Sequence, residues 1–385
     1  MLASVIVPDI LRGMQVLTPA CGSDKADGKG GSMREVMFGG VTVIASYLIY
    51  VLPLSVLSHL IYGSVLFRPE YILLAVLCAA PVLYYLRTHS TSAILSGFTH
   101  YGMGVGFIGL MVGLSGLMLA ALMPDYRTFI GQACAVLIVS LSILAIIRGR
   151  QVTVKRLTFS SAKLKRQKRL VFISDVHLGS NPGTHLETLC SHIGGLDYDY
   201  LLIGGDLFDS SAFRPDELQP LRELKVPIFF VTGNHEYYVR NHQDKLATLA
   251  DYHITTLDNQ SHDCEGIRLV GIADNQPPAR QAEIARQLVS DSQFTIVMVH
   301  QPAIWEDVPD NVDLMLSGHT HNGQIFPFNV LVRLQFKAVY GLYKRGMSQL
   351  YVSSGSGTWG PRMRLGTRNE IIHITLKPAH QTGKP

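Results

Sequence analysis

The sequence predicts an N-terminal α-helical transmembrane bundle followed by an α/β domain. Between residues 37 and 147 it consists of long apolar runs with few charged residues. From 169 to 377, short apolar runs alternate with polar stretches of helical composition. Five of those short runs end in aspartate, asparagine or histidine, which predicts a polar site where the strands of one sheet end.

Composition supports a chain that is partly in lipid. Only 16% of the 385 residues are charged, and the mean hydropathy is positive at +0.21. The formal net charge of +4 is too small to indicate a nucleic-acid partner by itself. Five cysteines without a CxxC pair argue against a disulfide framework and against a cysteine-based zinc site.

Residues 1–36 are expected to be a disordered N-terminal segment, because 22–31 have the glycine-rich, charged composition of a linker. Residues 37–147 are expected to form a membrane domain of about four helices. Its apolar runs are Phe38–Tyr62, Val65–Leu86, Tyr101–Met123 and Thr128–Ile147. Most approach the ~20 residues that cross a bilayer, and Arg68 and Glu70 interrupt the second run near its start. No Asp, Glu, Lys or Arg lies in the middle of a span, which favours an anchor over a transporter.

Residues 148–168 are expected to be a basic juxtamembrane linker. The stretch from Arg148 to Arg169 contains nine lysines and arginines and no acidic residue. The positive-inside rule assigns such a flank to the cytoplasm, and four spans put the N-terminus on the same side. The flank would also attract anionic lipid headgroups.

The α/β domain is expected over 169–377, followed by a tail at 378–385. The apolar, β-branched runs predict strands at 170–174, 200–204, 228–232, 268–272, 294–299, 313–317, 350–354 and 370–376. The stretches between them predict helices at 184–193, 216–224, 244–251 and 279–290.

Five polar blocks follow predicted strands, and they carry the chemistry. The candidate ligands that they supply are Asp175, His177, Asp206, Asn234, His300, His319 and His321. Oxygen and nitrogen donors without thiolate suit Mn, Fe or Zn ions. Seven donors exceed one tetrahedral site, which predicts two divalent metal ions.

This ordered set resembles the calcineurin-like metallophosphoesterase superfamily. The matching blocks are Asp175-x-His177, Gly205-Asp206-x-x-Asp209, Gly233-Asn234-His235-Glu236, His300 and Gly318-His319-x-His321. The resemblance implies a four-layer αββα sandwich in which Asp206 bridges two ions. Asp175, His177 and His321 would complete one metal site, and Asn234, His300 and His319 the other. His235 would be the catalytic histidine, and Asp209 would support the site.

The stretch Ser354–Gly366, with Glu370-Ile371, resembles a membrane-associated branch of that family. This branch includes transmembrane proteins with a metallophosphoesterase domain, bacterial phosphodiesterases and UDP-2,3-diacylglucosamine pyrophosphatases. The resemblance implies an integral protein of the bacterial inner membrane. Its expected activity is hydrolysis of a phosphodiester or diphosphate by a metal-activated hydroxide, with His235 donating to the leaving oxygen.

The membrane domain favours membrane lipids as partners and an amphiphilic substrate, such as a lipid A precursor or a phospholipid. The stretch Ile325–Phe336 could lie against the bilayer; alternatively, it is a core strand followed by a helix. Arg362 and Arg364 could bind phosphate, or they could be solvated loop charges. A soluble phosphodiester substrate and a tethered scaffold protein remain alternatives, whereas the lack of an aromatic-interleaved basic patch in the catalytic part argues against a nuclease.

Overall fold

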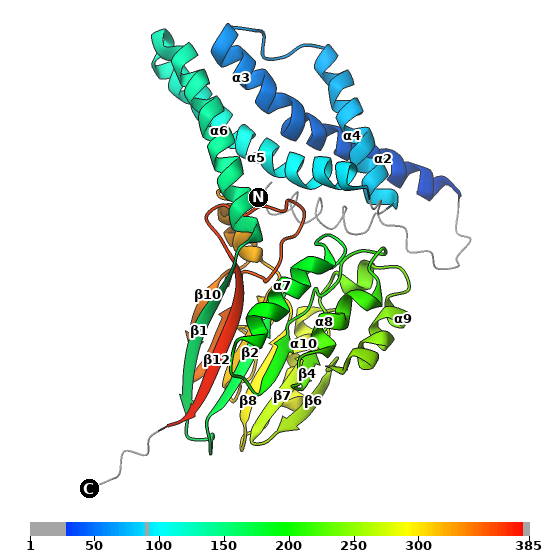
Figure 1. The fold of residues 1–385 in the computed structure, drawn as a ribbon, viewed down its shortest axis with the longest axis vertical. Helices are drawn as coiled ribbons and strands as arrows, with labels where there is room; N and C mark the ends of the chain where they lie inside the picture. The colour runs from blue at the N-terminus through cyan, green and yellow to red at the C-terminus, as the bar shows by residue number, and fades with distance from the viewer. Residues whose placement is uncertain (1–27, 89–91, 380–385) are drawn as a thin grey trace. The chain divides into compact units, whose positions relative to one another are not determined.

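The computed structural model describes residues 28–88 and 92–379, which form two compact units. The first unit runs to Arg148 and includes the short segment Gly360–Leu365. The second unit contains Gly149–Trp359 and the chain from Gly366 onward. Each unit has its own core, so each is described separately (Figure 1).

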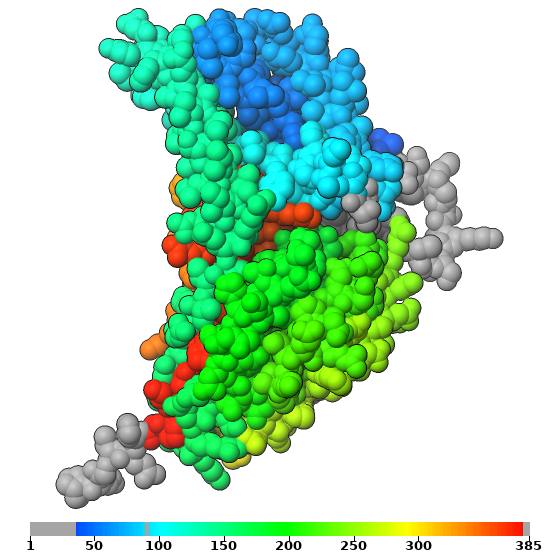
Figure 2. All heavy atoms as spheres, in the orientation of Figure 1, coloured from blue at the N-terminus to red at the C-terminus, as the bar shows by residue number. Residues whose placement is uncertain are grey.

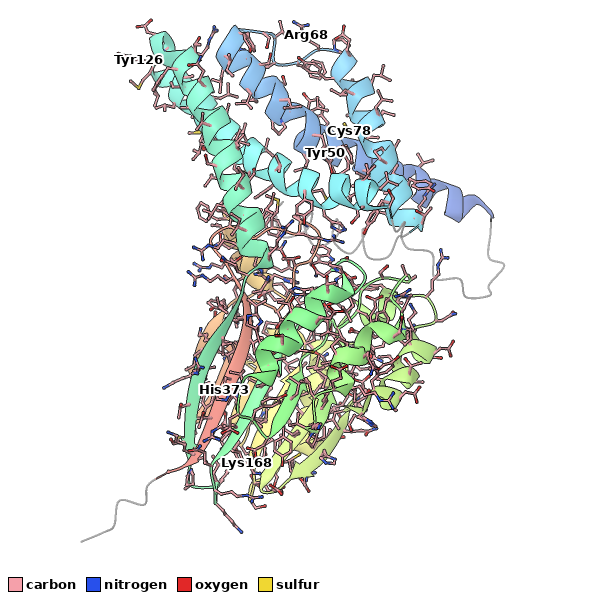
Figure 3. All side chains as sticks on the ribbon, in the orientation of Figure 1. Tyr50, Arg68, Cys78, Tyr126, Lys168 and His373 are labelled. Atoms are coloured by element: carbon pink, nitrogen blue, oxygen red, sulfur yellow. The ribbon has the colours of Figure 1, made fainter. Side chains whose placement is uncertain are left out.

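The first unit is helical. Its elements are α2 (Gly28–Ser46), a π-helical stretch (Tyr47–Val51), α3 (Leu52–Tyr62), α4 (Glu70–Thr88), α5 (Ala93–Leu122), a 3-10 turn (Pro124–Tyr126) and α6 (Arg127–Arg150). Four continuous helical stretches are long and apolar enough to cross a membrane: Val36–Tyr62, Glu70–Thr88, Ala93–Leu122 and Pro124–Arg150. Arg68 and Tyr126 lie in connections at one end of the unit, whereas Tyr50 and Cys78 lie within helices (Figure 3).

These helices confirm the expected fold class of an apolar helical bundle ahead of an α/β domain. Most of the N-terminal segment predicted to be disordered lies outside the described residues. The part from Gly28 onward begins α2, which differs from the prediction. The π-helical stretch directly precedes Pro53, whose missing N–H cannot take part in the normal helical hydrogen bonding.

The second unit is built on two six-stranded sheets. The first sheet has the order β1-β12-β2-β3-β4-β5, and the second has the order β10-β11-β9-β8-β7-β6. The strands are β1 (Val152–Ser161), β2 (Lys168–Ile173), β3 (Tyr200–Ile203), β4 (Ile228–Phe230), β5 (Ile254–Thr256), β6 (Gln260–Cys264), β7 (Ile267–Ile272), β8 (Phe294–Val299), β9 (Leu314–Ser317), β10 (Gly341–Arg345), β11 (Ser348–Val352) and β12 (Asn369–Pro378). Strands β2, β3 and β4 are parallel, and so are β7, β8 and β9.

The helices of this unit are α7 (Gly183–Gly194), α8 (Gln219–Arg222), α9 (His242–Ala247), α10 (Pro278–Leu288) and α11 (Phe328–Gln335). Helices α7 and α8 pack on the outer face of the first sheet and α10 on that of the second, whereas no residue of α9 or α11 is buried. Short 3-10 turns occupy Pro215–Leu218, Glu236–Tyr238, Thr248–Tyr252, Pro302–Ile304 and His321–Gly323. On the first sheet, α7 and α8 supply the outer layer, and their side chains cover the strands on this face (Figure 2).

Alternation along each strand separates the cores of the second unit. In β2, Leu170 and Phe172 face the core between the sheets, whereas Val171 and Ile173 face α7 and α8. In β8, Ile296 and Met298 join the same central core. The intervening valines, Val297 and Val299, pack with α10. Strands buried on both faces explain the continuous apolar runs of the sequence and complete the four-layer αββα arrangement.

The main difference from the sequence analysis concerns the basic linker expected over 148–168. Val152–Ser161 instead forms β1, an edge strand paired in parallel with β12 along ten positions. Lys155 and Arg156 are tolerated there because edge strands commonly carry charged side chains. At the C-terminal end, β12 extends to Pro378, and residues 380–385 lie outside the described part of the chain.

Candidate metal centre

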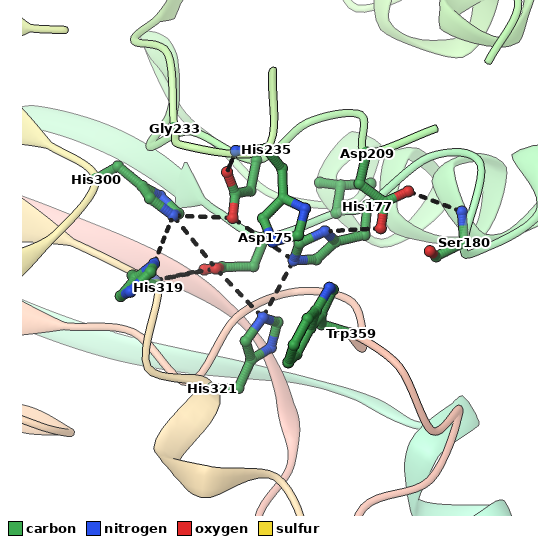
Figure 4. A network of polar contacts seen from close by, with 12 residues as sticks. Asp175, His177, Ser180, Asp209, Gly233, His235, His300, His319, His321 and Trp359 are labelled. Atoms are coloured by element: carbon green, nitrogen blue, oxygen red, sulfur yellow. Dashed lines mark hydrogen bonds and ion pairs between the residues drawn. The ribbon is translucent and has the colours of Figure 1, made fainter. Parts of the chain in front are cut away.

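The polar blocks that follow five strands come together at one edge of the second unit. Asp175 follows β2, Asp206 follows β3, Asn234 follows β4, His300 follows β8 and His319 follows β9. Figure 4 shows the side chains of Asp175, His177, His300, His319 and His321 converging on a common point, and Asp206 groups with His300 and His319. Strand β2 starts at Lys168, which lies at the end of the strand opposite to Asp175 (Figure 3). The carboxyl ends of the strands therefore build the site, as expected for such sheets.

One group of ligand atoms belongs to Asp175, His177 and His321. The Nε2 atoms of the two histidines are 3.1 Å apart, and His321 Nε2 is 3.5 Å from Asp175 Oδ1. All three side chains are buried. Two ligands held about 2.1 Å from one ion would be about 3.0–3.4 Å apart, so this spacing fits a single metal ion.

A second group belongs to Asp206, His300 and His319. His300 Nε2 lies 2.9 Å from Asp206 Oδ2 and 3.3 Å from His319 Nδ1. Asp206 Oδ2 is also 3.8 Å from Nε2 of His177, which belongs to the first group. Asp206 thus lies between the two groups, where a shared ligand would have to be.

Asn234, which follows strand β4, gives an independent indication that the cluster binds a ligand. Asn234 is 7% exposed, and neither its amide oxygen nor its amide nitrogen has a hydrogen-bond partner among the described residues. Burying an amide without partners is costly, and metal coordination through its oxygen would offset that cost. The residues present therefore fit a metal centre.

Two neighbouring groups orient the buried histidines. The Nδ1–H group of His300 donates to the carbonyl oxygen of Gly204 at 2.8 Å, because a carbonyl can only accept. Asp209 Oδ2 lies 3.1 Å from His177 Nδ1, and its other oxygen accepts from the N–H of Ser180 at 2.9 Å. Both histidines therefore direct Nε2 toward the centre, as metal-binding histidines do.

The backbone at the site is unusual. Five of the seven candidate ligands have a left-handed backbone: Asp175 (φ 55°), His177 (53°), Asp206 (52°), His319 (72°) and His321 (48°). Such conformations cost about 1–3 kcal/mol each outside glycine and cluster at functional sites. The chain therefore gives up stability at this edge in order to aim these side chains inward.

Buried charges shift the pKa values of the cluster. Burial raises the pKa of Asp206, but His300, His235 and His177 outweigh it and hold that pKa well below its usual range. Burial lowers the pKa of His319 to about 3, and its neighbour His300 adds to the effect. At neutral pH Asp206 is thus a carboxylate and His319 a neutral imidazole, which are the forms that bind metal ions.

His235 borders the first group and, with His177 and Asp209, forms a third group of possible ligand atoms. Its ring packs edge-on against His177, with centroids 4.8 Å apart, and its backbone N–H donates to Asp206 Oδ1 at 2.9 Å. The rings of Tyr238 and Trp359 flank it at 5.5 and 5.7 Å. Burial lowers its pKa to about 4, so His235 is a neutral hydrogen-bond donor in this geometry.

The two arginines predicted to bind substrate do not belong to this cluster. Both lie in Gly360–Leu365, the segment that groups with the helical unit. Arg364 is fully buried, and its backbone N–H donates to the carbonyl of Ala145 at 2.8 Å. A fully buried guanidinium offers no surface to a substrate, whereas the half-buried Arg362 stays a candidate.

Three further residues of the site were not assigned a role from sequence. Glu236 is fully buried and accepts hydrogen bonds from the backbone N–H groups of Asp206, Phe208 and Gly233 at 3.1, 3.1 and 2.7 Å, so it joins two ligand loops. Asp274, just after β7, accepts from Gln301, the neighbour of His300, at 2.8 Å. Asp274 follows the end of a strand, as the candidate ligands do, so its place in the sequence could have indicated it. The third residue is Trp359, whose ring flanks His235; no local sequence pattern indicates its role.

A two-sheet α/β core whose strand ends present histidines and carboxylates around one point defines a metallohydrolase class of site. The family model for calcineurin-like phosphoesterases matches residues 168–323. The chain belongs to the calcineurin-like phosphoesterase family. This family is metal-dependent, and the His/Asp clusters could bind the metal.

Curated relatives agree with this assignment. An uncharacterized metallophosphoesterase of Helicobacter pylori is 36% identical over 231 residues, covering 57% of this chain and 62% of its own. A bovine (Bos taurus) transmembrane protein with metallophosphoesterase domain is 34% identical, covering 60% and 56%. The Bacillus subtilis protein YpbG is 34% identical, covering 57% of this chain and 85% of its own. The chain thus spans less than two thirds of the first two relatives.

Proposed function

We propose that this protein is a membrane-anchored phosphoesterase that uses two divalent metal ions to hydrolyse a phosphodiester or diphosphate bond. The observation that carries the proposal is the position of Asp206 between two groups of buried ligands. When bound, such ions supply charge neutralisation of the phosphate and an activated water. Mn, Fe and Zn all suit the oxygen and nitrogen donors.

The protein's own residues would have separate roles in metal binding and catalysis. Asp175, His177 and His321 would hold one ion, and Asn234, His300 and His319 the other, with Asp206 shared. His235 would hydrogen-bond the leaving oxygen, because its ring borders that of the ligand His177. Asp209 would keep the ring of His177 oriented.

Membrane anchoring supports a substrate that is itself lipid-linked. Four helices suited to crossing a bilayer precede the catalytic unit, and two of the relatives are named as transmembrane proteins. The basic flank after the fourth helix supports a cytoplasmic catalytic unit, and bacterial relatives support an inner-membrane location. A nucleotide-linked diacylglucosamine or a phospholipid is the substrate class that we propose.

Hydrolysis of soluble phosphodiesters is the second candidate. The half-buried His235 and His319 offer a route for small substrates to the cluster. A tethered scaffold protein with an inactive domain is disfavoured, because every candidate ligand and His235 are present together.

A substrate panel tests the proposal. The purified full-length protein is assayed with Mn²⁺ against a UDP-linked diacylglucosamine, a phospholipid, bis-p-nitrophenyl phosphate and single-stranded DNA. We expect hydrolysis of a lipid-linked substrate at a higher kcat/KM than that of bis-p-nitrophenyl phosphate. Preference for the soluble ester would favour the second candidate, and inactivity on all four substrates would contradict the proposed function.

A further inference from the structure

Helix α11 (Phe328–Gln335) exposes an apolar face. None of its residues is buried, and Val330, Leu331 and Leu334 are 53%, 43% and 73% exposed. These three residues are spaced i, i+1 and i+4, so they share one side of the helix. Phe326, just before the helix, adds another 57% exposed ring. The core strand considered for this stretch is absent, and the exposed Val330, Leu331 and Leu334 imply a partner for this apolar face.

Contacts at both ends connect α11 to the candidate metal centre. After the helix, the ring of Phe336 packs against that of the ligand His319, with centroids 5.4 Å apart. Before it, the side-chain amide of Gln324 makes two 3.0 Å hydrogen bonds with the backbone of Trp359, whose ring flanks His235. The exposed helix is therefore next to the site.

The charged residues of α11 and its flanks indicate the kind of partner. From Phe326 to Tyr343 the sequence has two basic residues, Arg333 and Lys337, and no aspartate or glutamate. Arg333 and Lys337 are exposed, and Arg333, three residues after Val330, borders the apolar face. A helix with apolar residues on one side and basic residues at its margin matches the surface of an anionic bilayer.

Chain connectivity also favours a membrane. A single residue, Gln151, separates the end of the candidate membrane helix α6 from the start of β1. Within the second unit, the first residue of β1, Val152, pairs with Asn369. Two residues before Asn369, the hydroxyl of Thr367 donates to the carbonyl of Gln324 at 2.6 Å, just ahead of α11. The segment that leads into α11 thus lies at the end of the unit that is joined to a membrane helix.

We propose that α11 is an interfacial helix that inserts Val330, Leu331 and Leu334 into the surface of an anionic bilayer. Arg333 and Lys337 contact the lipid headgroups, as basic side chains at such margins do. One consequence rests on the proposed function: a lipid-linked phosphate reaches the metal centre without leaving the membrane.

Fluorescence quenching in nanodiscs tests the proposal on the full-length protein. Leu334→Cys is labelled with the NBD fluorophore and reconstituted with phosphatidylcholine and phosphatidylglycerol, with or without doxyl-labelled lipid. Glu283→Cys, at an exposed position of α10, is the matched control, and wild-type protein carried through labelling gives the background from native cysteines. We expect doxyl lipid to reduce emission at position 334 at least twofold and to leave position 283 unchanged.

Equal quenching by doxyl lipid at positions 334 and 283 would overturn the proposal. A blue-shifted probe at position 334 that doxyl lipid does not quench would also overturn it, because protein, such as a second copy of the chain, would then cover the face. Adding Arg333→Glu and Lys337→Glu to the labelled variant is expected to weaken the quenching. Unchanged quenching would refute the proposed contact of these two side chains with anionic headgroups. No readout depends on activity, so inactivity on the substrate panel would refute the proposed function alone.

Discussion

At the scale of single residues, two different acceptors perform the same task at the candidate centre. The Asp209 carboxylate and the Gly204 carbonyl each bind the Nδ1 side of a buried histidine, which leaves Nε2 free for the ligand position. The carboxylate could be predicted from its place in the Gly-Asp-x-x-Asp block. The carbonyl could not, because sequence does not reveal which backbone oxygen a side chain will reach.

Replacement of His235 tests its proposed role. We expect His235→Asn to lower kcat by about 10²–10⁴-fold, the usual contribution of a positioned proton or hydrogen-bond donor. Metal content should remain, because the seven proposed ligands stay in place; a loss of metal would instead make His235 a ligand, with His177 and Asp209 beside it. Steady-state kinetics together with metal analysis of the same preparation check this, and unchanged turnover would remove His235 from the mechanism.

Proton release on metal binding follows from the buried histidines. Burial lowers the pKa of His177 and of His300, but Asp209 at the first and Asp206 at the second outweigh it, so both pKa values are raised. Each ring is therefore more protonated than a free imidazole and must lose its proton to bind metal.

We thus expect Mn²⁺ binding near pH 7 to release protons and to weaken as the pH falls. Calorimetry in buffers of different ionisation enthalpy measures this release. A binding heat that is the same in every buffer, together with an affinity that does not change between pH 6 and 8, would contradict the raised pKa values of the two histidines.

At the scale of elements, the loop after β3 depends on a glycine. Gly205 has φ +91°, and a Cβ there would lie 2.6 Å from His300 Nδ1. We expect Gly205→Ala to displace His300 and to reduce metal affinity strongly, as measured by metal titration. Gly266→Ala is the matched control, because φ is +95° but no atom lies within 4 Å. The control should cost about 1–2 kcal/mol of stability and retain metal; equal metal loss in both variants would show that backbone strain alone is responsible.

The elements differ in how well sequence alone predicts them. Strands β2, β3, β8 and β9 are buried on both faces, so each appears as a continuous apolar run that ends in a ligand. Strand β6, Gln260–Cys264, is a polar edge strand whose pairing is set by β7, and nothing in its composition indicates a strand. Its conformation depends on a neighbour distant from any local pattern.

Helix α11 and strand β1 are two further elements that local sequence does not identify. Strand β1 belongs to the basic flank Arg148–Arg169, whose charge favours a linker, and its pairing with β12 makes it a strand. For α11, the apolar residues fit both a core strand and a surface helix, because short apolar runs do not distinguish the two. The absence of buried residues in the folded chain decides between them.

At the scale of the whole molecule, membrane topology follows from charge. The stretch Arg148–Arg169 is free of acidic residues, and its lysines and arginines follow the fourth candidate span directly. We expect a fluorescent-protein fusion after Pro385 to be fluorescent in the bacterial cytoplasm and an alkaline phosphatase fusion at the same point to be inactive. The opposite pattern would place the catalytic unit outside the cytoplasm and refute the basic-flank argument.

The central proposal is that Asp206 is a ligand shared by two ions, and its most direct test compares wild-type protein with Asp206→Asn. Asparagine tolerates the left-handed backbone of this position (φ 52°), so the variant should fold while losing the bridging charge. Metal content and Mn²⁺-dependent hydrolysis of bis-p-nitrophenyl phosphate are measured on both.

We expect two ions per wild-type chain and, in Asp206→Asn, a loss of both metal affinity and turnover of roughly 100-fold or more. Full turnover by Asp206→Asn, or by wild-type protein stripped of metal, would contradict the proposal.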